Sequence, residues 1–124
     1  MGKIHDEDRE NRIKNQVIVD CKGEAEEMTG WYYYMYDGLS FPMKGLANIP
    51  TSGNKTAQKK VKITKIDPDS ESGNIFKIGV IENGARQVTY ISLDYLIRIE
   101  DADQNVESIE MINDWLYWHN FELL

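Results

Sequence analysis

The sequence predicts an α+β fold with N-terminal helices, a small five-stranded SH3-like antiparallel β-barrel and a C-terminal helix. The period of the apolar residues carries this prediction, because it is three to four towards both ends of the chain and two in the middle. The composition agrees with a soluble globular protein, with 41% hydrophobic and 28% charged residues among 124. We expect a single domain over residues 1–124, large enough to bury a core without disulfides or a structural metal.

The N-terminal part of the chain predicts two helices, over about 5–19 and 24–38. Ile13 and Val17 are four residues apart in a charge-rich first segment, which favours a mostly solvated helix. Glutamates crowd the first turn of the second helix, where the positive end of the helix dipole favours them, and Gly38 is placed to cap its end. The apolar residues of this second segment step by three and four: Ala25, Met28, Tyr32, Met35 and Leu39.

The middle of the chain, about 42–99, alternates apolar with polar residues and predicts half-buried strands. Asn83-Gly84 predicts a hairpin with a type I′ turn. Polar residues predict loops over 47–58 and 67–73, and a tight turn is expected over 92–95. The expected strands are 42–47, 60–66, 75–82, 86–92 and 95–99.

The chain is expected to end with a helix over about 104–119, with Asp101 or Asp103 as its N-cap. Five of the six residues in the tract 31–36 of the preceding helix are aromatic, so they cannot all face one core. We expect this tract to join its helix to two neighbours, the barrel and the last helix.

The charge of the chain is −7 in total and is divided into blocks along the sequence. Residues 1–37 carry nine acids and five bases (−4), residues 38–66 six lysines and no acid (+6), and residues 67–124 twelve acids and three bases (−9). The net acid excess argues against a nucleic-acid partner, because phosphate binding normally needs a basic surplus. No apolar run approaches the roughly 18 residues of a membrane span, and the N-terminus is polar, so we expect a cytoplasmic protein without a membrane partner.

Catalytic constellations are absent from the sequence. His5 and His119 lie near opposite ends of the chain, and neither has an obvious acid or nucleophile beside it. The chain has no glycine-rich phosphate loop, and a lone Cys21 forms neither an internal disulfide nor, alone, a thiolate metal site. We therefore expect a protein that is not an enzyme.

Asp37 breaks the charge rule that the rest of its helix obeys. It falls in the last turn of the predicted helix 24–38, where the negative end of the dipole disfavours an acid. The last carbonyl groups of a helix lack intrahelical partners, so a carboxylate among them gathers hard oxygen atoms that a divalent cation would satisfy. A solvated or turn-forming role before Gly38 is the alternative. Two other acidic clusters compete for such a role: for 100–103 the alternative is helix capping, which needs only one of its acids, and 67–71 is better explained by a turn.

Two tracts carry an unusual order of aromatic and acidic residues. Glu24–Pro42 combines an acidic start with Gly30-Trp31-Tyr32-Tyr33-Tyr34, followed by Asp37, Leu39 and Phe41-Pro42. Leu93–Trp118 contains the acidic link Asp101-Ala102-Asp103, then Asp114-Trp115 and Tyr117-Trp118. In order and spacing both tracts resemble the cyanobacterial calcium-binding protein family of the CcbP type. The lysine-rich residues 44–65 show no such match.

The resemblance implies a small acidic protein that binds Ca²⁺ without an EF-hand, as an intracellular calcium buffer or sensor. The family's aspartate after the aromatic tract matches Asp37, and its acidic link matches Asp101 and Asp103. We therefore predict a calcium site centred on Asp37, with helix-end carbonyl groups and Asp101 or Asp103 completing the shell. The alternative is a non-enzymatic interaction module, a SH3-like barrel whose aromatic or lysine-bearing surface docks an unidentified protein partner.

Overall fold

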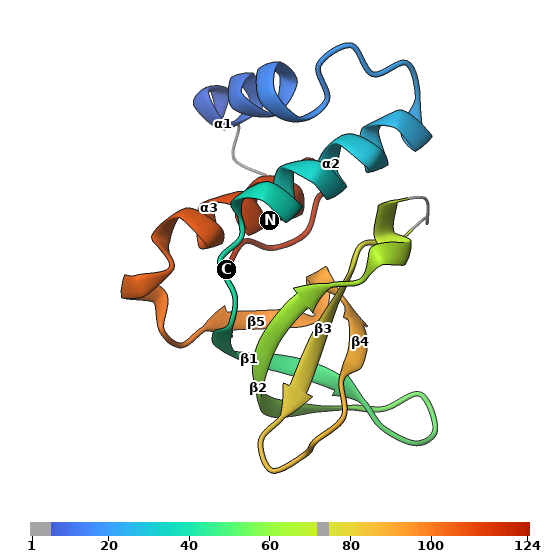
Figure 1. Cartoon of the computed structure of the whole chain (residues 1–124), viewed down its shortest axis with the longest axis vertical. Helices are drawn as coiled ribbons and strands as arrows, with labels where there is room; N and C mark the ends of the chain where they lie inside the picture. The colour runs from blue at the N-terminus through green and yellow to red at the C-terminus, as the bar shows by residue number, and fades with distance from the viewer. Residues whose placement is uncertain (1–5, 72–74) are drawn as a thin grey trace.

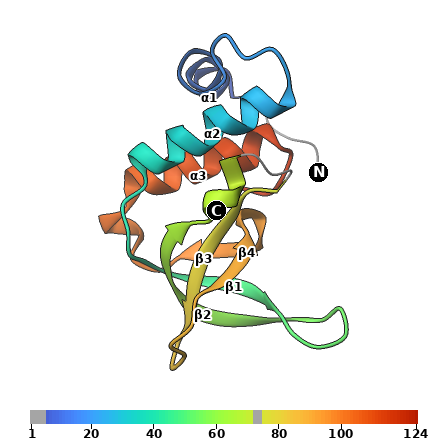
Figure 2. The same cartoon turned by 45° about the vertical axis from the view of Figure 1, so that its right-hand side comes forward.

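The computed structural model describes residues 6–71 and 75–124, which form a helical layer and a sheet (Figure 1). Figure 2 shows the helices together on one side of the sheet. Buried apolar side chains of both layers form one cluster, so the core lies between the helices and the sheet. In the described part of the chain, no helix is long and apolar enough to cross a membrane. The helices are α1 (Glu7–Arg12), α2 (Glu24–Gly38) and α3 (Val106–Trp118), and a π-helical segment, η1 (Ile13–Val17), continues α1.

The first helix is shorter than predicted and changes its geometry halfway. Asp6 caps α1 by accepting the backbone N–H of Arg9 at 3.0 Å, and the same hydrogen bond lowers the pKa of the Asp6 carboxyl. After Arg12 the chain continues as η1, in which the N–H of Ile18 reaches the carbonyl of Ile13. His5, the first residue of the predicted helix, lies outside the described residues.

Helix α2 has the predicted bounds, and its aromatic tract is divided between core and surface. Trp31 and Tyr32 are buried, whereas Tyr33 and Tyr36 are exposed. The tract reaches the last helix, since the Trp31 ring lies 5.7 Å from that of His119 and the Tyr34 hydroxyl contacts α3. This part of the predicted bridging role is confirmed.

The sheet has the five antiparallel strands that the alternation predicts, but it is not a closed barrel. Its order is β4-β3-β2-β1-β5, so β4 and β5 are edges and do not pair with each other. Both edge strands are short. In a closed barrel the apolar face of the sheet would be buried inside the barrel, whereas here the helical layer covers it. The SH3-like barrel is therefore not confirmed. The strands are β1 (Met43–Pro50), β2 (Thr56–Ile66), β3 (Lys77–Glu82), β4 (Thr89–Ser92) and β5 (Leu96–Ile99).

The polar loop predicted over 47–58 is wrong, because most of it is strand. β1 and β2 pair continuously from Met43 with Ile63 to Pro50 with Thr56. Only 51–55 remain as the connection. Polar residues such as Asn48 are compatible with this hairpin, since they lie on the face away from the core while backbone hydrogen bonds hold the register.

Two local predictions beyond this hairpin also need correction. Gly84 alone has a positive φ in the 83–84 turn, at 88°, and the type I′ turn requires a positive φ at both positions. Helix α3 begins after Asn105, because a short 3₁₀ turn, η4 (Ala102–Gln104), separates it from Asp101. Neither predicted aspartate caps α3.

Candidate metal centre

Asp37 occupies the place in α2 that the sequence indicates. It is exposed in the last turn of the helix, which carries no basic residue. The helix ends as the N–H of Leu39 bonds to the carbonyl of Met35 at 2.9 Å. Beside Asp37 is a shallow hollow of about 460 Å³, bordered by Gln16 of η1 and Met111 of α3. An exposed carboxylate next to the free carbonyl ends of a helix is an arrangement of hard oxygen donors that suits a divalent cation.

Asp101 and Asp103 lie together in the link between β5 and α3. The Asp101 carboxylate accepts the backbone N–H of Lys44 at 3.1 Å and is half-buried. Its carbonyl group accepts the side-chain amide of Asn105 at 2.9 Å. Asp103 is exposed within η4. Asp101 thus fixes the start of β1, and Asp103 keeps a carboxylate open to solvent.

The two acidic segments flank the same stretch of chain, 38–44. The backbone N–H of Ser40 bonds to the Ser108 hydroxyl at 3.1 Å, which holds this stretch against the first turn of α3. Across residues 6–71 and 75–124, however, no three His, Cys, Asp or Glu side chains are grouped closely enough to hold a metal ion. The carboxylate oxygens of these aspartates suit a hard cation. Because so few carboxylates lie together, carbonyl groups and water would have to supply a large share of the ligands of the ion.

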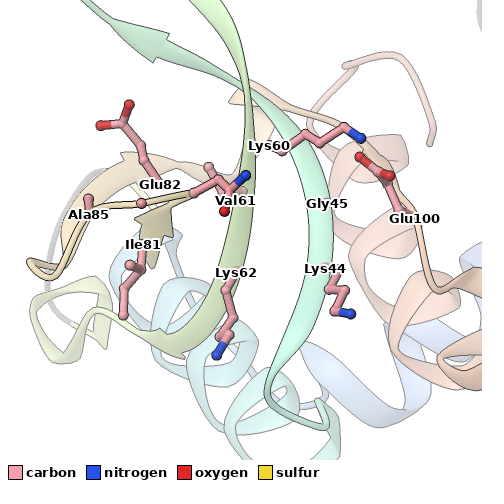
Figure 3. Close-up of a pocket in the computed structure, with 11 residues that line it drawn as sticks. Lys44, Gly45, Lys60, Val61, Lys62, Ile81, Glu82, Ala85 and Glu100 are labelled. Carbon is pink, nitrogen blue, oxygen red and sulfur yellow. The ribbon is translucent and has the colours of Figure 1, made fainter.

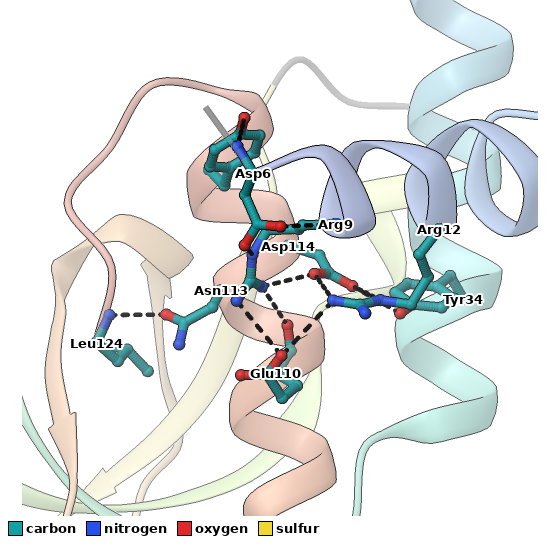
Figure 4. Close-up of polar contacts among 9 residues, drawn as sticks. Asp6, Arg9, Arg12, Tyr34, Glu110, Asn113, Asp114 and Leu124 are labelled. Carbon is teal, nitrogen blue, oxygen red and sulfur yellow. Dashed lines mark hydrogen bonds and ion pairs between the residues drawn. The ribbon is translucent and has the colours of Figure 1, made fainter. Parts of the chain in front are cut away.

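A buried ionic cluster that sequence reasoning missed lies where α1, α2 and α3 meet (Figure 4). Asp114 is fully buried and accepts hydrogen bonds from the guanidinium groups of Arg9 and Arg12. The Tyr34 hydroxyl donates to the same carboxylate at 2.8 Å. Glu110, one turn earlier, contacts both arginines at its half-exposed carboxylate. This cluster therefore ties α1 to α2 and α3.

The same contacts shift two pKa values. Burial and the hydrogen bond to Asp114 raise the pKa of Tyr34 to about 12. The hydrogen bond to Asp114 also raises the pKa of Arg12 above its ordinary value. Because arginine and tyrosine donors occupy both oxygens of Asp114, this carboxylate is a structural group and is not open to a cation. Spacing is the signal that could have found the cluster, since Arg9 and Arg12 are three residues apart in α1 and Glu110 and Asp114 are four residues apart in α3, which gives one basic and one acidic helix face.

A second acidic hollow, of about 850 Å³, opens between α2 and the end of α3. Glu24, Glu27 and Glu71 line it together with aromatic rings of Trp31 and Trp118. The Tyr33 hydroxyl donates to Glu71 at 3.1 Å, which raises the pKa of the tyrosine. These acids are also too far apart to form a metal cluster within the described residues.

Comparison with known proteins points to one family. A family model described as calcium binding, Calci_bind_CcbP, matches residues 11–119. The crystal structure of Anabaena CcbP superposes with a TM-score of 0.83 and 31% identity, covering 99% of this chain and 100% of that one. A calcium-binding protein in its calcium-binding form gives a TM-score of 0.73 and 30% identity, over 95% of each chain. A search of curated proteins gave no match.

Proposed function

The chain belongs to the calcium-binding CcbP family, and from this membership we propose that it binds Ca²⁺ through Asp37 and neighbouring backbone carbonyl groups. The role is non-enzymatic, a cellular calcium buffer or sensor without an EF-hand. Asp101 or Asp103 is proposed to complete the shell from the β5–α3 link. Calcium accepts six to eight oxygen ligands in flexible geometries, so one or two carboxylates with carbonyl groups and water suffice as donors.

The position of Asp37 at the carbonyl end of α2 is the observation that carries this proposal. An exposed acid there costs about 0.3–1 kcal/mol against the helix dipole, and no basic residue of the last turn offsets it. A bound cation reverses the sign of that interaction. It attracts both the carboxylate and the negative end of the dipole, so the same residue that weakens the helix alone strengthens it when the ion is present.

The second segment is supported by its position beside the chain that leaves α2. Asp101 holds the N–H of Lys44, and Ser40 is held by Ser108, so the residues that follow Asp37 run between the acidic link and α3. Asp103 is the more available of the two aspartates, because it is exposed and its carboxylate makes no hydrogen bond within the described residues.

Calcium titration of the purified chain by calorimetry tests the proposal. Wild type should bind Ca²⁺, and Asp37→Asn should weaken binding at least about tenfold, which corresponds to about 1.4 kcal/mol. Asp8→Asn is the matched control, because Asp8 is also an exposed helical acid but lies in the first turn of α1. Asp101→Asn and Asp103→Asn, measured separately, assign the second segment.

Two results would count against the proposal at different levels. Absence of heat and of any thermal shift at millimolar Ca²⁺ removes calcium binding by this chain. Unchanged affinity in Asp37→Asn keeps calcium binding but removes the site. Tryptophan fluorescence during the same titration distinguishes a sensor, which changes conformation with the ion, from a buffer. Magnesium is the control ion, since its small octahedral shell suits such a site poorly.

A further inference from the structure

The outer face of the sheet, opposite the helices, concentrates basic side chains from four strands. Paired residues of antiparallel strands share a face, and Lys44 pairs with Lys62 while Leu46 pairs with both Lys60 and Arg98. Their neighbours along the strands, such as Met43 and Ile63, are buried against the core. We call this surface the basic face: Lys44, Lys60, Lys62, Lys65, Lys77 and Arg98.

The charges of the basic face are not neutralised by ion pairs. Within residues 6–71 and 75–124, ion pairs form only around Arg9 and Arg12 in the helical layer. The Lys65 ammonium lies 5.5 Å from the centroid of the Tyr90 ring, which leaves its positive charge in place. Since salt screens charges beyond about 10 Å, a partner at this face meets a positive potential despite the total of −7.

A hollow of about 440 Å³ gives the basic face a place for a side chain of a partner (Figure 3). Lys60 and Lys62 line it from β2, together with apolar Ile81. Glu82 and Glu100 also line it. The mixture of exposed ammonium groups and apolar surface favours a ligand that carries both carboxylates and apolar side chains.

We propose that the basic face docks an acidic segment of another protein, one in which carboxylates alternate with apolar side chains. The evidence is charge complementarity with lysines that form no ion pair in the described part of the chain, and the partly apolar hollow that two of them line. This role does not depend on calcium binding at Asp37, because it uses the opposite side of the sheet from the helix that carries that residue.

Nucleic acid fits the basic face less well. Single strands need aromatic rings for base stacking, and Tyr90 has Lys65 over its ring. A long polyanion would also extend past the face towards the acidic helical layer. A second copy of the chain fits poorly as well, because a basic face meeting an acidic face is a head-to-tail contact and cannot form the common two-fold dimer, in which both copies use the same patch.

Fluorescence anisotropy with a short labelled peptide of glutamate and leucine tests the proposal. Lys60→Glu with Lys62→Glu should weaken binding at least about tenfold, because each reversal replaces attraction by repulsion. Lys14→Glu with Lys22→Glu is the matched control in the helical part of the chain and should change affinity less than about threefold. Raising the salt concentration to about 1 M, where the screening length is about 3 Å, should weaken wild-type binding.

All titrations are run in EDTA, so that a failure here leaves the calcium proposal untouched. Circular dichroism establishes that the variants are folded, and Lys60→Gln with Lys62→Gln supplies a milder pair that removes charge without reversing it. No saturable binding, or equal losses in the test and control pairs, overturns the proposal. Tighter binding of a single-stranded oligonucleotide, or self-association that the Lys60 and Lys62 changes abolish, overturns it in favour of the other occupant.

Discussion

Replacing the buried aspartate of the ionic cluster, Asp114→Asn, should be among the most destabilising isosteric changes in the chain. The side chain is fully buried and accepts hydrogen bonds from Arg9, Arg12 and Tyr34. Asparagine keeps the shape, so no cavity forms. It removes the charge, however, and turns an N–H₂ group towards donors that have no acceptor to replace the lost oxygen.

The expected magnitude follows from the burial of each partner. Breaking a buried ion pair by removing one member costs about 3–5 kcal/mol. The Arg9 side chain is 9% exposed and that of Arg12 is 32% exposed, and Glu110 still contacts both, so we expect the lower end, about 3 kcal/mol. With an unfolding entropy of about 2.1 cal/mol/K per residue over 124 residues, this loss lowers the melting temperature by about 12 °C.

Glu110→Gln is the matched control, because it lies on the same helix and contacts the same arginines with a side chain that is 52% exposed. An ion pair that exposed is worth less than about 1 kcal/mol. Urea unfolding followed by tryptophan fluorescence gives both free-energy changes on one scale. If Asp114→Asn costs no more than Glu110→Gln, burial of the carboxylate does not govern this cluster and the reasoning is refuted.

Two further predictions concern a close backbone contact and a histidine. A Cβ on Gly30 would overlap the carbonyl oxygen of Val17, so Gly30→Ala should destabilise by about 1–3 kcal/mol although alanine is the better helix former. Gly23→Ala, which meets open space, is the control in urea unfolding, and a stabilised Gly30→Ala would show that this contact is not tight. Burial lowers the pKa of His119, whose ring stacks on Trp115 at 4.4 Å. The unfolded chain therefore binds a proton on this histidine at a higher pH than the folded chain does. The stability that neutral His119 contributes is present above about pH 6.5 and is lost as the pH falls. Melting temperatures between pH 7.5 and 5.5 should show this loss in wild type and less of it in His119→Gln, and equal slopes would contradict it.

Local signals predicted the second helix well, but they predicted the extent of the first helix and the ends of the strands poorly. Helix 24–38 was predicted with its observed bounds because its apolar steps, its first-turn glutamates and Gly38 all act within the helix itself. The hairpin of β1 and β2 extends further than its apolar alternation indicates, since backbone pairing holds polar residues such as Asn48 in strand. The turn at 83–84 was located correctly, but its type depends on the twist of the paired strands.

The candidate site also has one part that local signals predict and another that depends on the tertiary structure. Asp37 can be recognised from sequence because a charge at a helix end is a local matter of dipole sign. Whether Asp101 and Asp103 share an ion with it depends on how the β5–α3 link sits beside 38–44, which no spacing along the chain reveals. The same holds for the basic face, which is assembled from four strands.

By itself the sequence determined the identity of the helices, the alternation of five strands, the resemblance to the calcium-binding family and the anomalous charge of Asp37. Only the tertiary structure decided that the sheet stays open, that Arg9 and Arg12 meet Asp114, and that the lysines gather on the face away from the helices. The physical reason is the separation along the chain of the groups that each interaction joins. Helix caps, dipoles and side-chain periodicity act over a few residues, whereas the pairing of β1 with β5 joins residues about fifty positions apart and that of Arg9 with Asp114 about a hundred.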